Sequence, residues 1–335
     1  MKLSWCAYRL NFRHPFRLAT GERTGTDSVF VRLEKKGMYG YGEATLPPYL
    51  KENTSSVISF LKTIQAECLS AGTPQEFLSL LHQLEGENHF AVCAVEEAFL
   101  QLQRKLNKEE ANDVRKVNTL STYTLGLGTE EEIVEKLKIA EGFPVLKVKL
   151  QSETDQQPIN LIRKYTDRPL CIDANQGWKD MENSIRFSFW LRDMNVMMIE
   201  QPFAADHYEM HEVFRKKSAL KVIADESITT LESLKKNYAC FDGVNVKLLK
   251  CGGPIAASEM LRFAKEKSMF TLIGCMSESS CGVYHAAELG AEADLLDVDG
   301  PLLINNDPFN GFELNGGIIR LSKLEPGLEL NFVNE

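Results

Sequence analysis

Short apolar segments alternate with longer amphipathic segments from residue 121 to about residue 298. The apolar segments have the length of buried parallel strands, and the segments between them repeat their apolar positions every three or four residues, as helices do. Successive strands begin roughly 20 to 28 residues apart, which predicts an α/β fold, a (β/α)8 barrel of the TIM type. The expected strands are 121–126, 145–150, 169–173, 196–200, 221–225, 243–248, 270–274 and 294–298, and the expected helices between them are 130–139, 159–165, 183–193, 208–217, 231–237, 255–267 and 279–289.

An open, doubly wound sheet is the competing arrangement for the same repeat. Such a sheet usually carries a glycine-rich phosphate loop after its first strand. The segment Leu125-Gly-Leu-Gly128 lacks the third glycine of that loop, so a dinucleotide site is weakly supported.

The first part of the chain has a different pattern. It predicts strands at 3–12, 28–34 and 38–45, with a turn at Gly37 between the last two. The polar, glycine-containing stretch 17–26 is expected to be a mobile loop. Three helices follow, near 54–68, 75–84 and 88–106; Asn53 or Thr54 caps the first, whose expected apolar face is Val57, Phe60, Leu61, Ile64 and Cys68.

These patterns divide the chain into three parts. Residues 1–118 are expected to form an α+β capping domain that ends in the polar linker 107–118, and residues 119–305 form the barrel. Residues 306–335, with strand-like stretches at 318–321 and 328–332, are expected to return to the capping domain.

Composition narrows the functional classes. A formal net charge of −9 and a pI near 5.4, with no basic stripe, argue against a nucleic-acid partner. No apolar run reaches the roughly 20 residues of a membrane span, and the amino terminus lacks the apolar core of a signal peptide. The eight cysteines have no C-x-x-C spacing, so we expect core thiols in a reducing cytoplasm. The sequence leaves the oligomeric state open, a homo-oligomer included.

Three acidic residues end three successive barrel strands. Asp173, Glu200 and Asp225 each follow an apolar run, and the carboxyl ends of barrel strands meet at one face. Oxygen ligands favour a hard cation, and Mg²⁺ is the expected ion. One such acid is as easily explained as a helix cap or loop start, but three in succession, flanked by lysines, favour a metal site.

Three lysines lie at the same face of the expected barrel. Lys147 and Lys149 alternate with apolar residues on the second strand, so both side chains point to one side. Crowding against Lys147 and a nearby cation would disfavour protonated Lys149, as a general base requires. Lys247 lies on the sixth strand, opposite Lys149 across the barrel. This geometry suits proton removal from the carbon next to a metal-bound carboxylate, with return of a proton on the opposite side.

Several motifs together resemble the enolase superfamily, and more closely its muconate-lactonising subgroup. The resemblance extends over essentially the whole chain, including YGYGEATLPPY in the expected capping domain, and implies a modified, enolase-like barrel. It implies Mg²⁺ on Asp173, Glu200 and Asp225, with Lys149 and Lys247 as acid/base groups and Lys147 on the substrate carboxylate. The motifs are KVK at 147–149, DAN at 173–175, IEQP at 199–202, ADES at 224–227 and VNVK at 244–247.

The eighth strand is similar to that of the dipeptide epimerases, notably the L-Ala-D/L-Glu type. The D-x-D pair Asp297 and Asp299 would bind the ammonium terminus of a dipeptide, because two neighbouring carboxylates need a cation between them. Thr124 and Met276 match further substrate contacts. At the position of the family's anion-binding arginine, this chain has Gly21. Arg23, two residues later, is the expected substitute.

The resemblance therefore implies an isomerase, a Mg²⁺-dependent epimerase acting on a dipeptide, with the 17–26 loop and Pro47-Pro48-Tyr49 excluding water. Two alternatives stay open: a lyase or cycloisomerase of the same subgroup, such as an o-succinylbenzoate synthase or muconate cycloisomerase, and a barrel that binds small acids without turnover. His207 and His211 have the i, i+4 spacing of zinc ligands, but we interpret them as a surface pair on an outer helix.

Overall fold

Eight parallel strands lie side by side in chain order, from β5 to β12. The two ends of this sheet also meet: the Thr122 amide donates to the Leu296 carbonyl at 2.8 Å, and the Leu296 amide donates to the Leu120 carbonyl at 3.0 Å. The sheet is therefore a closed barrel, as predicted, and the open-sheet alternative is wrong. The strands are β5 Tyr123–Leu125, β6 Leu146–Lys149, β7 Leu170–Asp173, β8 Val196–Glu200, β9 Lys221–Ala224, β10 Gly243–Lys247, β11 Phe270–Gly274 and β12 Leu295–Asp297.

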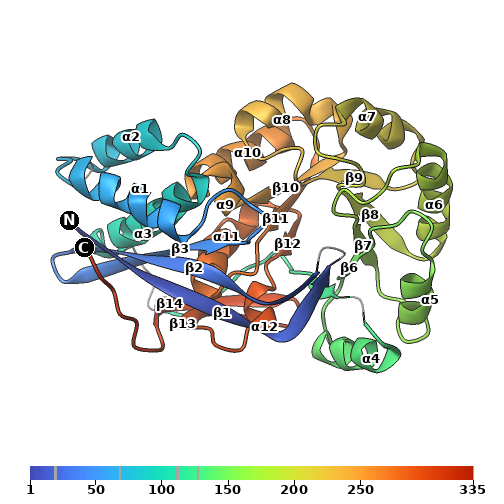
Figure 1. Cartoon of the computed structure of the whole chain (residues 1–335), viewed down its shortest axis with the longest axis horizontal. Helices are drawn as coiled ribbons and strands as arrows, with labels where there is room; N and C mark the ends of the chain where they lie inside the picture. The colour runs from blue at the N-terminus through green and yellow to red at the C-terminus, as the bar shows by residue number, and fades with distance from the viewer. Residues whose placement is uncertain (19–20, 68, 110–112, 127, 335) are drawn as a thin grey trace.

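This computed structural model describes residues 1–18, 21–67, 69–109, 113–126 and 128–334. Helices cover the outside of the barrel (Figure 1). A capping box at Thr129 begins the first of them: the Thr129 hydroxyl accepts from the Glu132 amide, and the Glu132 carboxylate accepts from the Thr129 amide. The helices are α4 Glu130–Ile139, α5 Gln157–Arg163, α6 Met181–Asp193, α7 Tyr208–Lys217, α8 Leu231–Asn237, α10 Pro254–Glu266 and α11 Ser280–Glu288, with the short α9 Leu248–Cys251 and α12 Gly300–Leu303.

A three-stranded antiparallel sheet and three helices lie beside the barrel (Figure 1). The predicted mobile loop at 17–26 is wrong for its described residues, because β1 and β2 pair as far as Leu18 opposite Gly21. The pattern missed this hairpin because backbone pairing does not require apolar side chains. Residues 19, 20 and the predicted apolar position Cys68 lie outside the described residues. The elements are β1 Lys2–Leu18, β2 Gly21–Lys35, β3 Met38–Leu46, α1 Thr54–Glu67, α2 Pro74–Leu84 and α3 His89–Leu106.

The carboxyl-terminal segment forms a second small sheet, in the order β13-β14-β4. Its strands are β4 Arg115–Lys116, β13 Phe309–Asn315 and β14 Ile318–Pro326. The strand expected at 328–332 is wrong: among the described residues that follow β14, only Val333 forms a β-bridge, with Trp5 of β1, through two backbone hydrogen bonds of 2.8 Å. Both termini therefore lie near each other at one end of the molecule (Figure 1).

Four side chains predicted for the apolar face of α1, Val57, Phe60, Leu61 and Ile64, are buried, and α1 packs against β1, β2 and α3. Cysteines 6, 93, 171, 240, 251, 275 and 281 are free thiols. Among the residues that the structure describes, no helix is both long and apolar enough to span a bilayer.

Candidate active site

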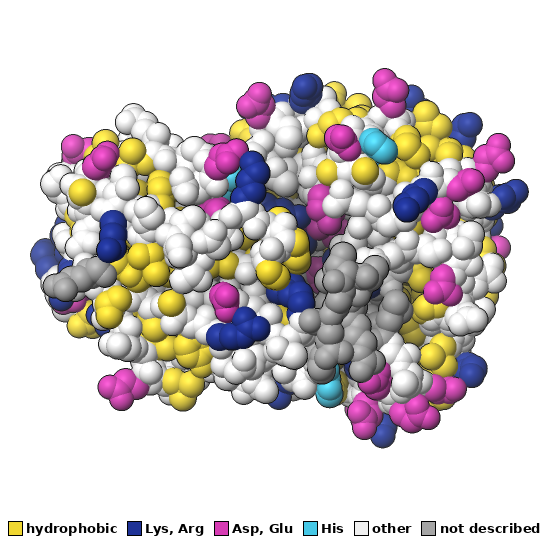
Figure 2. Space-filling model, in the orientation of Figure 1, with side chains coloured by type: hydrophobic (Ala, Val, Ile, Leu, Met, Phe, Trp, Pro, Cys, Tyr) yellow, Lys and Arg dark blue, Asp and Glu magenta, His cyan; other side chains and the backbone are white. Residues whose placement is uncertain are grey.

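A cavity of about 750 Å³ opens at the carboxyl ends of the barrel strands. The capping domain contributes Arg23, Tyr49 and Phe90 to its wall, so the cavity lies between the two parts of the molecule. In Figure 2, lysine and arginine side chains gather at the junction between these parts. The predicted site residues from the barrel that line it are Thr124, Lys147, Lys149, Asp173, Asp225, Lys247, Met276, Asp297 and Asp299.

The two lysines of β6 point into this cavity, as their alternation predicted. Lys147 is buried, with its Nζ 2.7 Å from Asp297 Oδ2, 2.9 Å from Glu200 Oε2 and 3.3 Å from Asp173 Oδ2. Lys149 Nζ lies 3.1 Å from Asp173 Oδ2 and donates to Asn175 Oδ1 at 2.9 Å. Burial alone would lower the pKa of Lys147, but the surrounding carboxylates outweigh it and raise that pKa above its ordinary value.

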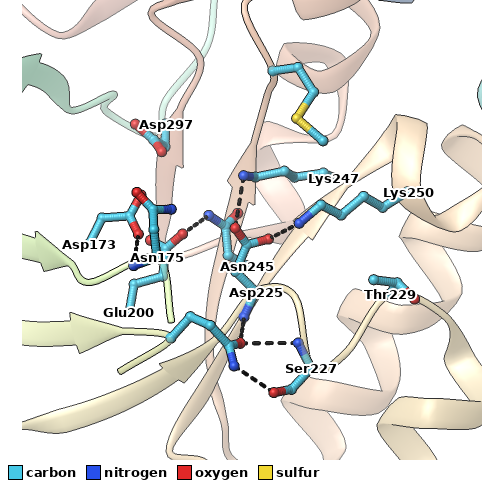
Figure 3. Close-up of polar contacts among 12 residues, drawn as sticks. Asp173, Asn175, Glu200, Asp225, Ser227, Thr229, Asn245, Lys247, Lys250 and Asp297 are labelled. Carbon is cyan, nitrogen blue, oxygen red and sulfur yellow. Dashed lines mark hydrogen bonds and ion pairs between the residues drawn. The ribbon is translucent and has the colours of Figure 1, made fainter. Parts of the chain in front are cut away.

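Lys247 lies on β10, four strands from β6 in the eight-stranded order, and therefore on the opposite wall. Its Nζ donates to Asp225 Oδ2 at 3.0 Å, while Lys250 Nζ donates to Asp225 Oδ1 at 2.6 Å (Figure 3). Burial opposes protonation of Lys247, yet Asp225 holds its pKa above the ordinary value. The pattern missed Lys250, although it lies three residues after Lys247, one helical turn along α9.

Asp173, Glu200 and Asp225 are all buried and come from neighbouring strands. Strand pairing places Asp173 opposite Glu200, so both side chains lie in one layer of the barrel. Burial raises the pKa of Glu200 to about 7. Burial also opposes ionisation of Asp173, but Lys147 and Lys149 keep the pKa of Asp173 below its ordinary range. Glu200 is thus the acid with the least local charge compensation.

Within the described chain, no three histidine, cysteine, aspartate or glutamate side chains are spaced as ligands of one metal ion. Lys147 and Lys247 lie against the three acids instead. The donor set nevertheless fits a hard cation, because it consists of buried carboxylate oxygens from adjacent strands, and burial leaves Glu200 undercompensated. A divalent cation would supply the missing positive charge.

The two aspartates of the D-x-D pair, Asp297 and Asp299, have different surroundings. Asp297 accepts from the Thr122 hydroxyl at 2.7 Å and is paired with Lys147. Asp299 accepts hydrogen bonds from Thr124, including one from the Thr124 amide at 2.6 Å. Burial, and then the charge of Asp297, raise the pKa of Asp299 to about 6. Thr124 thus holds Asp299, and Thr122, absent from the predicted site, orients Asp297.

Arg23 lines the cavity from the capping domain. Its guanidinium lies 5.5 Å from the Phe12 ring centre and 5.6 Å from that of Tyr49. Its Nε and Nη2 atoms are buried and have no hydrogen-bond partner in the described part of the chain. Burial lowers the pKa of Arg23. Two unsatisfied donors facing a cavity are suited to an anion.

Two further polar residues support the acids, and sequence reasoning did not identify them. Asn245 Nδ2 donates to Glu200 Oε1 at 3.0 Å. Gln201 has a positive φ of 40°, and its Oε1 accepts from the amides of Asp225 and Ser227 at 3.0 Å each. The VNVK and IEQP motifs contain these two residues, but their contacts depend on strands that are distant in sequence.

The predicted surface pair of histidines is wrong for one of its members. His207 is exposed, but His211 is buried, and its ring lies 3.4 Å from the Phe203 amide. Burial lowers the pKa of His211 to about 4, so it is a neutral core residue. The pattern failed because α7 packs this turn onto the loop after β8.

Known proteins resemble this chain along nearly its whole length. Residues 130–329 match the family described as enolase C-terminal domain-like. The chain is 37% identical to the L-Ala-D/L-Glu epimerase of Bacteroides thetaiotaomicron, with coverage of 98% of this chain and 87% of that protein. It is 34% identical to the L-Ala-D/L-amino acid epimerase of Flavobacterium johnsoniae, covering 97% and 98%. The dipeptide epimerase of Cytophaga hutchinsonii, complexed with Mg and D-Ala-L-Val, has the same fold, with a TM-score of 0.86, 22% identity and coverage of 99% and 98%.

Proposed function

The chain belongs to the enolase superfamily, and we propose that it is a Mg²⁺-dependent dipeptide epimerase. The reaction is a 1,1-proton transfer at the α-carbon next to the dipeptide carboxylate. One observation carries the proposal: Lys149 and Lys247 approach the cavity from opposite walls, each held by a different buried carboxylate. Inversion of a carbon centre requires an acid and a base on opposite faces.

Asp173, Glu200 and Asp225 would hold the metal ion. When bound, Mg²⁺ supplies a Lewis acid that polarises the substrate carboxylate and stabilises negative charge on it. Neutralising Asp225 would also weaken its hold on Lys247, whose pKa would then fall toward working pH.

One lysine of the pair removes the α-proton, and the other delivers a proton to the opposite face. For one epimer Lys149 is the base and Lys247 the acid, and for the other epimer the roles reverse. Asn175 and Asp173 orient the Lys149 ammonium. Lys147 adds positive charge beside the carboxylates and is suited to contact the substrate carboxylate.

The two ends of the cavity suit the two ends of a dipeptide. Asp299, beside Asp297, would bind the ammonium terminus, with Met276 contributing to the adjacent wall. Arg23 would bind an acidic side chain on the second residue, which favours L-Ala-D/L-Glu as the substrate pair. Tyr49 packs against Arg23, so the 47–49 loop and the β1–β2 hairpin would exclude water together.

The free thiols of the described cysteines fit a reducing cytoplasm, and a small dipeptide is the proposed partner.

The test follows L-Ala-L-Glu in deuterium oxide by proton NMR, with and without Mg²⁺. An epimerase incorporates deuterium at the glutamate α-carbon and forms L-Ala-D-Glu. A panel of L-Ala-L-X dipeptides then defines the second residue. Absence of exchange with every dipeptide at saturating Mg²⁺ would exclude the proposal and favour a binding protein. Exchange followed by elimination or ring closure would indicate a lyase or cycloisomerase.

A further inference from the structure

Three acidic side chains meet where the capping domain contacts the barrel, away from the proposed metal ligands. Glu43 lies on β3, Glu97 lies on α3, and Glu278 precedes α11. All three are buried, with 0%, 1% and 4% of their surface exposed, respectively. Buried acids in close proximity cannot all be ionised unless cations compensate them.

Burial raises the pKa of Glu43, but the hydrogen bonds that its carboxylate accepts act in the opposite direction and favour its ionised form. Its carboxylate accepts from the hydroxyls of Ser28, Thr45 and Ser279 and from the amides of Ser279 and Gly282. The two amides belong to the first turn of α11, where the helix dipole favours an anion. A residue of the capping domain therefore caps a helix of the barrel.

The surroundings of Glu278 favour the neutral, protonated form of its carboxyl group. In the described structure its only hydrogen bond is accepted at Oε1, from the Met276 amide at 2.6 Å. Glu278 Oε2 and Glu43 Oε2 both lie against Gly282. A Cβ atom at Gly282 would lie 2.4 Å from Glu278 Oε2 and 3.3 Å from Glu43 Oε2. A charge on both oxygens would be strongly repulsive in this buried position.

Several titratable or charged groups face Glu278. Burial, then the charge of Glu43, raise its pKa to about 8. Lys247 acts in the opposite direction but does not outweigh them. The other facing groups are Glu97 and Cys93 of α3, Cys275 after β11, and Cys281 of α11.

Glu278 holds a segment that borders the site. Cys275, Met276 and Ser277 line the cavity beside the D-x-D pair. The Cys275 amide donates to the Asp297 carbonyl at 3.1 Å, so this segment is tied to the strand that carries the ammonium site.

We propose that Glu278 is a positioning residue, a neutral acid that fixes the 275–277 segment for substrate binding. This inference rests on the proposed function for its kinetic part only. Ionisation of Glu278 would place a second charge against Glu43 and displace the segment from the wall of the cavity.

The protonation state is tested without any assay of activity. Between about pH 5 and pH 8 the unfolded chain has lost the proton that folded Glu278 retains, so stability from this group declines as pH rises through that interval. Glu278→Gln has no such titration. The melting temperature of Glu278→Gln minus that of wild type should therefore increase by about 2 °C or more from about pH 5 to pH 9. For Glu259→Gln, at an exposed position on α10, this difference should not change with pH. Parallel curves for wild type and Glu278→Gln would overturn the inference.

Carbon NMR of glutamate carboxyls is a second measurement, and comparison with Glu278→Gln assigns the resonance. A carboxyl that titrates near pH 8 in wild type and is missing from the Glu278→Gln spectrum is expected; if the resonance lost in the variant titrates below about pH 6, the neutral acid is contradicted.

The positioning role is tested by steady-state kinetics with L-Ala-L-Glu. Wild-type KM should rise several-fold above about pH 8, and Glu278→Gln should abolish that rise. Glu278→Ala should raise KM at every pH, with a smaller change in kcat. A KM profile that is the same in all three proteins would refute positioning. If wild type shows no epimerisation, the proposed function fails, while the melting and NMR experiments still decide the state of Glu278.

Discussion

Lys147 Nζ lies 2.7 Å from Asp297 Oδ2 and so joins β6 to β12, with β5 between these two strands in the closed barrel. The contact gives the two aspartates of the D-x-D pair different roles, because Asp297 is already paired with the buried Lys147 ammonium. Asp299 has no lysine among its hydrogen-bond partners in the described structure. The substrate ammonium would therefore rely on Asp299, and Asp297 would serve mainly to hold Lys147.

This division predicts an acid limit to substrate binding. The pKa of Asp299 is raised to about 6, so its carboxyl is neutral below that pH and ionised above it. KM for L-Ala-L-Glu should rise by up to about tenfold per pH unit below pH 6, with a smaller change in kcat. Asp299→Asn should have a high KM at every pH, without the further rise below pH 6. A wild-type KM that is constant down to about pH 4.5 would contradict the assignment.

Replacing either base should abolish epimerisation but not every exchange reaction. Lys149→Ala and Lys247→Ala should each lose about 10³-fold or more in turnover, because each removes the group on one face. Each variant should still exchange the α-proton of one epimer, and the two variants should differ in which epimer they exchange. Proton NMR in deuterium oxide measures both quantities. Exposed Lys179→Ala is the control, and normal epimerisation by either base variant would refute the two-base mechanism.

Removal of the metal should stop turnover reversibly. Treatment with EDTA should abolish activity, and Mg²⁺ should restore it. Asp225→Asn should lower the Mg²⁺-dependent rate by about 10²-fold or more, because it removes a proposed ligand and leaves Lys247 and Lys250 without their carboxylate. Calorimetric titration with Mg²⁺ should show weaker binding by this variant than by Asp206→Asn, whose carboxylate is exposed. Full activity in EDTA would exclude the proposed metal dependence.

Arg23 should determine the second residue of the substrate. Arg23→Met should raise KM for L-Ala-L-Glu about 10- to 100-fold, because it removes a charged donor to the glutamate side chain. The same change should have little effect on L-Ala-L-Met, which has no anionic side chain. Arg9→Ala is the matched control, since Arg9 pairs with Asp27 on the exposed part of the same sheet. Equal losses for both dipeptides would show that Arg23 has only a structural role.

The residues whose positions on the barrel strands were predicted correctly have local signals in the sequence. Asp173 and Lys147 could be placed because apolar runs define the strands, and strand ends in a barrel meet at one face. The 17–26 hairpin was missed because its pairing uses backbone groups, and His211 because its burial depends on a neighbouring loop.

The sequence by itself determined the barrel repeat, the strand-end acids and the two alternating lysines, since these follow from periodicity along one strand at a time. Only the tertiary structure decided which charge neutralises which. Lys250 reaches Asp225, Lys147 reaches Asp297, and Glu43 of the capping domain caps α11 of the barrel. Such pairings depend on distances between segments far apart in the chain, and burial then sets how strongly each charge affects its neighbour.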